Sequence, residues 1–448
     1  MFDFIKSNKK VFGLITIGII LIFLIFAVFL FGSSSAIVEP GEPVLPGAGE
    51  DREFPQGQDP SNVFGPMGGD EWVDGEKVNK SNPHFRAITK EPVAGALVYD
   101  KIGDTIVSPK IRYVTVENGH IFDADLDIVG GEDKISDKTV ANIGEVEWDN
   151  SGSSVMLRYY NSNLSVVNST IGSFMRGSST DNSGENISAP LEFKTRQLEN
   201  NIRASAFSPD GTQIFYLVTE GGGTKGYLES VITGTNALVW ESIFTTLSVS
   251  WESDDSILIY TNPSSEINGV IWKLNPNTTK SQVLVGDELA LAGKLNPAGD
   301  KLLFSIQEEK GDVFSLRILD MDTGDFNVLP LSTMVDKCTW GGTGSDYVYC
   351  AVPRGAVSGD FLERWYMGTE HSDDLLWRID SNTNTVKELI DPNEEVGVPF
   401  DMIDLQTDSE EEYLVFRAKV NNALWALKLP EKEVIEEEEG EEEEEVEE

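Results

Sequence analysis

The stretch AFSPDGTQIFYLV, residues 206–218, contains a strand, a tight turn and a second strand. Pro209 presets the first corner of the turn, and Gly211 tolerates its left-handed exit. An aromatic residue or Leu, followed by a polar turn and by an apolar residue seven positions later, recurs along the chain. These units start at Trp148, Phe207, Trp251, Leu295 and Trp340, at spacings of 59, 44, 44 and 45 residues, and a looser copy starts at Leu405.

A second landmark recurs inside each unit. Trp272 and Leu316 each follow the start of their unit by 21 residues, and Trp377 and Trp425 occupy equivalent third strands. A period near 45 residues with four strands per unit is typical of a β-propeller. With an earlier unit over residues 94–128, the sequence predicts an all-β, seven-bladed propeller built of four-stranded blades.

The last unit lacks a fourth strand, because the chain runs from LWALKL directly into a run of glutamates. A spare strand lies at the other end of the domain, at Phe85–Thr89. We expect this strand to complete the last blade and close the ring, which removes open sheet edges.

Three segments resemble the PD40 repeat of TolB-like propellers, which prolyl-oligopeptidase-type propellers also use. These segments are FSPDGTQIFY, WDNSGSSV and LNPAGDKLLF. The resemblance covers residues 140–350 well and the flanks loosely. It implies that these units fold as propeller blades, and it gives little information about a ligand. The chain departs from TolB, whose propeller follows an α/β domain, and from the peptidases, which append an α/β-hydrolase domain.

The N-terminus predicts a membrane anchor. Residues 11–31 are 21 residues without a charge, which is enough helix to cross a bilayer. Lys6, Lys9 and Lys10 precede them, so the N-terminus is expected in the cytoplasm and the rest outside. A cleaved signal peptide is the alternative, with a small-residue site at 34–36, although the apolar core is longer than is usual for one.

The composition divides the chain into four parts. Residues 1–32 form the basic stub and anchor, the Pro- and Gly-rich residues 33–83 a disordered linker, 84–430 the propeller, and 431–448 a disordered acidic tail. The net charge of −42 excludes nucleic acid as a partner, because two polyanions repel each other. The expected partners are the membrane, through residues 11–31, and a protein or cell-envelope ligand.

The two cysteines, Cys338 and Cys350, are expected to form a disulfide across a hairpin centred near residue 344. Whether this disulfide can form depends on the register of the hairpin. If Trp340 pairs with Tyr347, then Cys338 opposes Tyr349 and Cys350 points to the other face, unless a bulge in the turn restores the match.

The sequence contains no pattern of catalytic residues. A serine hydrolase needs a nucleophile elbow of the G-x-S-x-G kind, and no such pentapeptide occurs. Asp123, Asp125 and Asp127 alternate as one solvated face of a strand and lack the glycine and glutamate of a calcium loop. Neither a metal site nor a cofactor is predicted.

One loop stands out. The distance from Trp340 to Trp377 is 37 residues, against 21 in the two preceding units, so about 16 residues are inserted between the second and third strands. Aromatic residues with arginines are typical of binding hot spots. The candidate binding residues are Arg354, Phe361, Arg364, Trp365, Tyr366 and His371. The alternative is that FLERWYM folds as a short helical turn and plugs the propeller face.

These features favour a membrane-anchored, extracytoplasmic propeller that acts as a binding scaffold at the cell surface or in a periplasm. One alternative is a propeller enzyme of the hydrolase or lyase type, with its site among acidic residues of the central channel. The other is a purely structural envelope component.

Overall fold

The computed structural model describes residues 71–73, 76–78, 84–102, 105–160, 166–180, 186–311, 313–355, 357 and 359–431. Contacts divide the chain into Met1–Phe54 and Pro55–Glu448, and every described residue lies in the second unit. The predicted anchor at residues 11–31 and the acidic tail beyond residue 431 lie outside the described residues. Among the residues that are described, no helix has the length and apolar character needed to cross a membrane.

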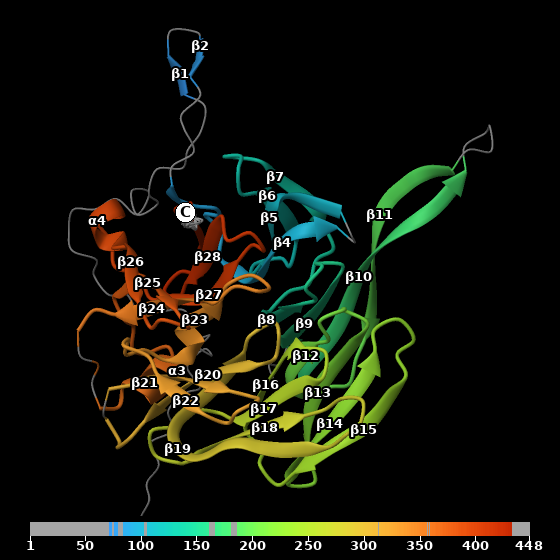
Figure 1. The fold of residues 1–448 in the computed structure, drawn as a ribbon. Helices are drawn as coiled ribbons and strands as arrows, with labels where there is room; N and C mark the ends of the chain where they lie inside the picture. Colours follow the sequence, from blue (N-terminus) through green and yellow to red (C-terminus); the bar gives the residue numbers. More distant parts are fainter. Residues whose placement is uncertain are drawn as a thin grey trace, which may run out of the picture. The chain divides into compact units, whose positions relative to one another are not determined.

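The described residues form antiparallel sheets that follow one another along the chain (Figure 1). The first sheet contains β4 (Val93–Ile102), β5 (Thr105–Thr115), β6 (Ile121–Asp125) and β7 (Glu132–Ser136). The second contains β8 (Ile143–Trp148), β9 (Ser154–Tyr160), β10 (Val167–Thr180) and β11 (Asn186–Gln197). The third contains β12 (Ile202–Phe207), β13 (Gln213–Glu220), β14 (Gly223–Ser230) and β15 (Asn236–Ser242).

A seven-stranded sheet follows. It contains β16 (Leu247–Ser253), β17 (Ser256–Thr261), β18 (Gly269–Leu274), β19 (Ser281–Leu295), β20 (Lys301–Gln307), β21 (Ser315–Asp320) and β22 (Phe326–Val328). Its middle strand, β19, pairs with β18 through its first half and with β20 through its second half. One continuous strand therefore replaces the connection that separates sheets elsewhere.

Two further four-stranded sheets complete the order. One contains β23 (Cys338–Trp340), β24 (Tyr347–Pro353), β25 (Asp374–Asp380) and β26 (Val386–Ile390). The other contains β27 (Met402–Thr407), β28 (Tyr413–Ala418), β29 (Leu424–Lys428) and β3 (Phe85–Ala87). The helical segments are the 3₁₀ turn η2 (Val335–Lys337), α3 (Phe361–Tyr366) and α4 (Pro392–Val396).

The first strands of successive sheets lie against one another. β4 contacts β8, β8 contacts β12, β12 contacts β16, β16 contacts β19, β19 contacts η2, which leads into β23, and β23 contacts β27. β27 in turn contacts β4, so the first strands form a closed inner ring. Apolar clusters fill the spaces between neighbouring sheets, as the alternation of buried side chains in these strands requires.

The predicted closing strand is confirmed. β3 pairs antiparallel with β29, with Phe85 opposite Leu427 and Ala87 opposite Trp425. The Phe85 ring lies 5.1 Å from the Trp425 ring and also contacts Phe400 and Phe416. Residues separated by more than 330 positions are thereby joined in one sheet.

The hairpin registers follow the seven-residue offset in three units. Trp148 pairs with Val155, Phe207 with Ile214, and Leu295 with Leu302. In the unit that starts at Trp251 the register shifts between Ser250 and Ser253, so that Leu258 opposes Ser250 instead. An irregularity of this kind takes up one residue and is not visible in the spacing of apolar positions.

Within the predicted linker, the structure describes only a hairpin of β1 (Glu71–Val73) and β2 (Glu76–Val78). The rest of the segment 33–83 lies outside the described residues, so the disordered linker stays a prediction.

A substitution at Gly211 would test how closely the hairpin turns pack against the neighbouring sheet. Its φ is +68°, and a Cβ at this position would lie 2.6 Å from an Asp149 carboxylate oxygen of the preceding sheet. We expect Gly211→Ala to lower the free energy of unfolding by about 2–3 kcal/mol, from backbone strain and the clash together. Gly221, with φ +63° and no atom within 4 Å of such a Cβ, isolates the strain, and Gly221→Ala is expected to cost about 1 kcal/mol. Equal losses in denaturant titrations would contradict the packing argument.

Cys338 and Cys350 are joined in a disulfide between β23 and β24. They are directly opposite, as are Trp340 and Val348, so the register that pairs Trp340 with Tyr347 is wrong. The amide of Gly341 donates to the Tyr347 carbonyl at 2.9 Å, so the ladder continues in the same register into the turn and needs no bulge.

The disulfide closes a short loop, since the cysteines are 12 residues apart. We expect its reduction to lower the free energy of unfolding by roughly 2–3 kcal/mol, because the reduced unfolded chain has more freedom. A variant with both cysteines replaced by Ala should show no response to reductant. Thiol labelling in denaturant without reductant checks the bond itself, and two labelled thiols there would contradict it.

Candidate functional site

The inserted loop between β24 and β25 folds into the short helix α3, as the plug alternative expects. Phe361, Leu362 and Trp365 are buried and belong to an apolar cluster with Ala290 of β19 and Met334. Two of the six candidate binding residues, Phe361 and Trp365, therefore have most of their side chains packed inside the protein. Their burial fixes α3 to elements of other sheets.

Glu363 connects α3 to a loop of another sheet. Its carboxylate accepts hydrogen bonds from the Ser265 amide and the Ser265 hydroxyl, both at 2.7 Å. Burial alone would raise the pKa of Glu363, but these hydrogen bonds hold it below the ordinary value for a glutamate. The helix thus reaches from its own sheet to the loop between β17 and β18.

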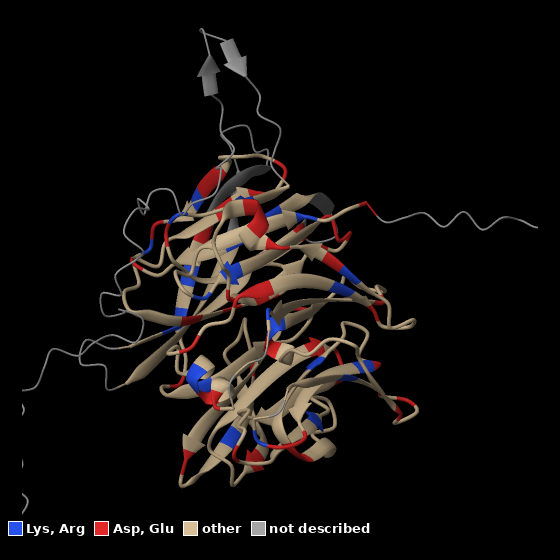
Figure 2. Cartoon of the chain, turned by 90° about the vertical axis from the view of Figure 1, so that its left-hand side faces the viewer, with Lys and Arg blue, Asp and Glu red and all other residues tan. Residues whose placement is uncertain are grey.

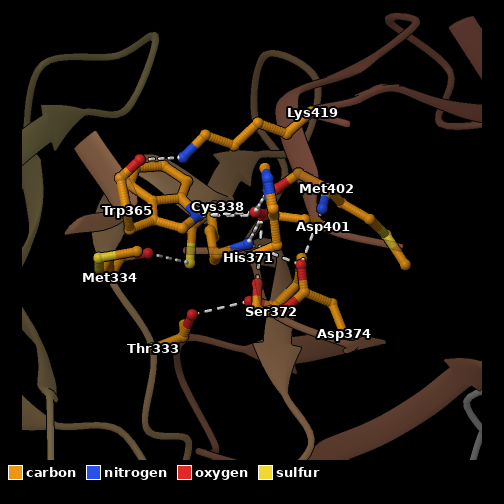
Figure 3. Close-up of polar contacts among 12 residues, drawn as sticks. Thr333, Met334, Cys338, Trp365, His371, Ser372, Asp374, Asp401, Met402 and Lys419 are labelled. Atoms are coloured by element: carbon orange, nitrogen blue, oxygen red, sulfur yellow. Dashed lines mark hydrogen bonds and ion pairs between the residues drawn. The ribbon is translucent and has the colours of Figure 1, made fainter. Parts of the chain in front are cut away.

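A fully buried ionic cluster lies beneath the helix (Figure 3). Lys337 of η2 is 0% exposed, and its ammonium lies 2.6 Å from the carboxylates of both Asp374 and Asp401. It also donates to the Met402 carbonyl at 3.3 Å. One lysine therefore connects η2, the start of β25 and the start of β27.

Asp401 is the centre of the cluster in Figure 3. The Trp365 indole N–H lies 3.0 and 2.9 Å from its two oxygens, and the Ser372 hydroxyl donates to it at 3.1 Å. His371 Nδ1 lies 3.3 Å from the same carboxylate. Burial acts to raise the pKa of Asp401, but the Lys337 charge and these hydrogen bonds hold it below the ordinary value.

Lys419, from the loop between β28 and β29, covers the cluster from the other side. Its ammonium lies 3.4 Å from the centroid of the Trp365 ring and donates to the Trp365 carbonyl. Burial lowers the pKa of Lys419 to about 8, although the charge of Asp401 acts in the opposite direction. Cation–π contact and the hydrogen bond fix Trp365 in place.

A polar cavity of about 300 Å³ opens beside α3. Its lining includes four of the six candidate residues, namely Arg354, Phe361, Arg364 and His371. Both guanidinium groups are held at its wall. Arg354 pairs with Asp391 at 2.6 Å, and Arg364 pairs with Glu370 at 3.0 Å.

The structure thus brings Arg354, Arg364 and His371 together at one cavity, buries Trp365 beneath it, and leaves Tyr366 exposed and outside the cavity lining. The sequence did not indicate Lys337, Asp374, Asp401 or Lys419. Each carries a charge that ordinarily lies on a surface, and no pattern in the sequence marked it as buried.

Among the described residues that line the cavity, no serine hydroxyl is paired with a histidine. His371 contacts Asp401, but the neighbouring Ser372 hydroxyl donates to Asp401 and not to the imidazole. A serine nucleophile needs the histidine as its base. Among the described residues, no group of three His, Cys, Asp or Glu side chains is placed to hold a metal ion.

A second polar site lies on the inner ring. Glu147 of β8, Glu252 of β16 and Asp404 of β27 come from three sheets. Burial raises the pKa of Glu147 to about 8, and the carboxylates of Glu252 and Asp404 add to this shift. Asp404 is itself paired with Arg417 at 2.6 Å.

No protein-family model matches the sequence, and no curated protein matches it. Solved structures do match. An oligogalacturonate lyase in complex with manganese is 10% identical, with 78% of this chain and 93% of that chain covered and a TM-score of 0.51. The oligogalacturonate lyase from Vibrio parahaemolyticus is 7% identical, with 78% and 94% covered and a TM-score of 0.50.

The chain is a β-propeller. TolB from Acinetobacter baumannii is also among its structural neighbours, at 15% identity and a TM-score of 0.39. The match covers 62% of this chain and 62% of the length of TolB. At these identities the likeness concerns the fold of the propeller, and its function has to be argued from its own residues.

Proposed function

We propose that this propeller is a binding scaffold at the cell envelope, anchored in the membrane by residues 11–31 and carried on the linker 33–83. The ring is proposed to count seven blades, with the seven-stranded sheet divided at β19 into two of them. The acidic residues 431–448 form a solvated tail. The partner is a protein or another envelope component.

One observation carries the binding proposal. The cavity beside α3 has ion pairs at its wall, Arg354 with Asp391 and Arg364 with Glu370, and the buried cluster around Asp401 holds that wall in place. Rigid placement of polar groups reduces the entropy lost on binding, which favours recognition.

Site-specific photocrosslinking in living cells tests this function. A benzoylphenylalanine in place of His371 should give a discrete crosslinked product, because this residue lines the cavity. The same group in place of Val386, an exposed residue on the outermost strand β26, is the matched control. Equal labelling patterns from the two positions, or no product at position 371, would refute binding at the cavity.

The location is tested by protease. Protease added outside intact cells, or outside spheroplasts where an outer membrane is present, is expected to cut between residues 33 and 82 and release the propeller. This follows from the lysines that precede the apolar segment 11–31. A linker that stays intact while an external control protein is digested would refute the orientation.

A second candidate is an enzyme whose site lies at the inner ring. The observation in its favour is the raised pKa of Glu147, since a carboxyl group that stays protonated near neutral pH can act as a general acid. Oligogalacturonate with manganese is the first substrate to test, because two neighbours in fold are oligogalacturonate lyases. Ultraviolet-absorbing unsaturated product that disappears in Glu147→Gln would support this candidate, and its absence with the wild-type protein would remove it.

A further inference from the structure

The connections between strands alternate between the two ends of the inner ring, because neighbouring strands are antiparallel. One end carries the short turns after the first and third strands of each sheet. The other end carries the loops between second and third strands and the links to the next sheet. We call this second end the loop face. It includes residues 243–246, 262–268, 308–314, 354–373 and 419–423.

Exposed apolar side chains gather on the loop face. Five of its residues are between 64% and 85% exposed, namely Ile243, Ile267, Val313, Met367 and Val420. They lie in five different loops, which connect β15 to β16, β17 to β18, β20 to β21, β24 to β25 and β28 to β29. The turns at the opposite end are rich in Asp, Asn, Gly, Ser and Thr, and they expose two large apolar residues, Ile128 and Ile232. This uneven distribution of exposed apolar residues between the two ends favours the loop face as the side that contacts a partner.

The loops that carry these residues are fastened to one another. Lys310 pairs with Glu266 of the neighbouring loop, and Glu363 of α3 accepts the two hydrogen bonds from Ser265. Lys419 donates to the main chain of α3. Direct contacts therefore join the loops of four sheet segments, so the apolar residues are presented on a preorganised surface.

The surroundings of the apolar residues are acidic. The four longer loops, 262–268, 308–314, 354–373 and 419–423, contain eight acidic and four basic residues. All four bases are engaged within the protein. Lys310 pairs with Glu266, Arg354 with Asp391, Arg364 with Glu370, and Lys419 lies on the Trp365 ring. Acidic residues of these loops are engaged as well, so the relevant quantity is the net formal charge of the four loops, which is −4 (4 basic minus 8 acidic residues). The loop face therefore presents apolar residues in loops of net negative charge. Figure 2 shows where Lys, Arg, Asp and Glu lie on one side of the protein.

We propose that the loop face docks a protein whose contact surface is apolar at its centre and basic at its rim. This proposal rests on the binding function proposed above and specifies its partner. The negative charge of the loop face favours positive charge on the partner. The exposed apolar residues supply the area that docking would bury. A second copy of the chain is disfavoured, because the net charge of −42 would be brought against itself.

The first and last residues of the propeller lie away from the loop face. Lys428, the last residue of β29, donates its amide hydrogen to the His84 carbonyl, so the propeller begins and ends at the same place. β29 starts at the loop face and runs to the opposite end, where His84 and Glu431 therefore lie. A docked protein would not meet either of these residues.

The test uses the full-length protein in detergent and a random peptide library displayed on phage. A loop variant carries Ile243→Ser, Ile267→Ser, Met367→Ser and Val420→Ser, and a control variant carries Ile128→Ser and Ile232→Ser at the opposite end. Peptides selected on the wild type should combine aromatic or leucine residues with Lys and Arg. Their affinity should fall about tenfold or more for the loop variant, stay within about twofold for the control variant, and weaken with added salt.

Several outcomes would overturn the proposal. Equal loss of affinity in both variants, or selected peptides without basic residues, would refute the docking surface. So would wild-type dimers in light scattering that the loop variant abolishes, or binding to anionic vesicles that it abolishes. A crosslinked partner at position 371 that the loop variant still captures would refute this inference alone and leave the binding function in place.

Discussion

Lys337→Met is expected to lower the free energy of unfolding by about 3–5 kcal/mol, because it removes the ammonium group that directly contacts two buried carboxylates. Asp374 and Asp401 are both 0% exposed, and Lys337 is the group that lies 2.6 Å from each. Methionine has a similar length and keeps the packing, so the loss reports the charge. Denaturant titration at neutral pH measures it.

A surface lysine supplies the control. Lys301 pairs with Asp346 at 2.9 Å, but the aspartate side chain is half-exposed, so Lys301→Met should cost about 1 kcal/mol or less. Comparable losses in the two variants would contradict the buried-charge argument.

The pH dependence of the Lys337 variant has a defined sign. Without the lysine, burial should raise the folded-state pKa of both aspartates above the unfolded value of about 4. The free-energy cost of burying the two charged carboxylates is then present at neutral pH. It decreases as the pH falls and the carboxyl groups are protonated. The variant should therefore approach the wild type in stability on acidification, and a gap that widens instead would contradict this account.

Deletion of residues 84–90 is the second change with a large expected effect. It removes β3 and the Phe85 ring that contacts Trp425, Phe416 and Phe400, and it exposes the edge of β29. We expect a loss on the order of 5 kcal/mol, from the buried aromatic and its neighbours together, and a melting temperature lower by roughly 10 °C or more. The free edge should also promote aggregation.

The matched deletion removes residues 33–70, which precede every described strand. This protein should melt like the full-length chain. Calorimetry and light scattering distinguish the two, and equal melting temperatures would show that the last sheet is stable without β3.

The repeat made the fold predictable. Turn residues such as Pro209 and Gly211 act locally, and an apolar position seven residues later marks the partner strand, so a single sequence contains both signals. The pairing of the N-terminal strand with the last sheet was also predictable, because the last unit lacked a strand and the N-terminus had one to spare. Hairpin registers near Trp251 and Trp340 were less certain, since a shift of one residue changes the pairing without changing the apolar pattern.

The candidate site was only half predictable. The insertion that contains α3 was visible as a change in spacing, but its sequence suits a binding loop and a plug equally. Trp365 is buried because Asp401 accepts its N–H and Lys419 covers its ring, and both partners lie more than 30 residues away in the sequence. The buried cluster depends on three charged side chains meeting in space. Secondary-structure propensity and hydrophobic periodicity describe residues that are close in sequence. They contain no information on charged residues that come together only in the folded protein.

The continuous strand β19 has a consequence for how the chain can be cut and rejoined. Most junctions between sheets are loops, where new chain ends tend to be tolerated. Ser281–Leu295 is hydrogen-bonded to β18 through its first half and to β20 through its second half. A circular permutant opened near residue 290 would lose a strand shared by two sheets, whereas one opened at Gly221, where a turn joins β13 to β14, would lose only a turn. The two sheets that share β19 should therefore exchange their amide hydrogens as one cooperative unit.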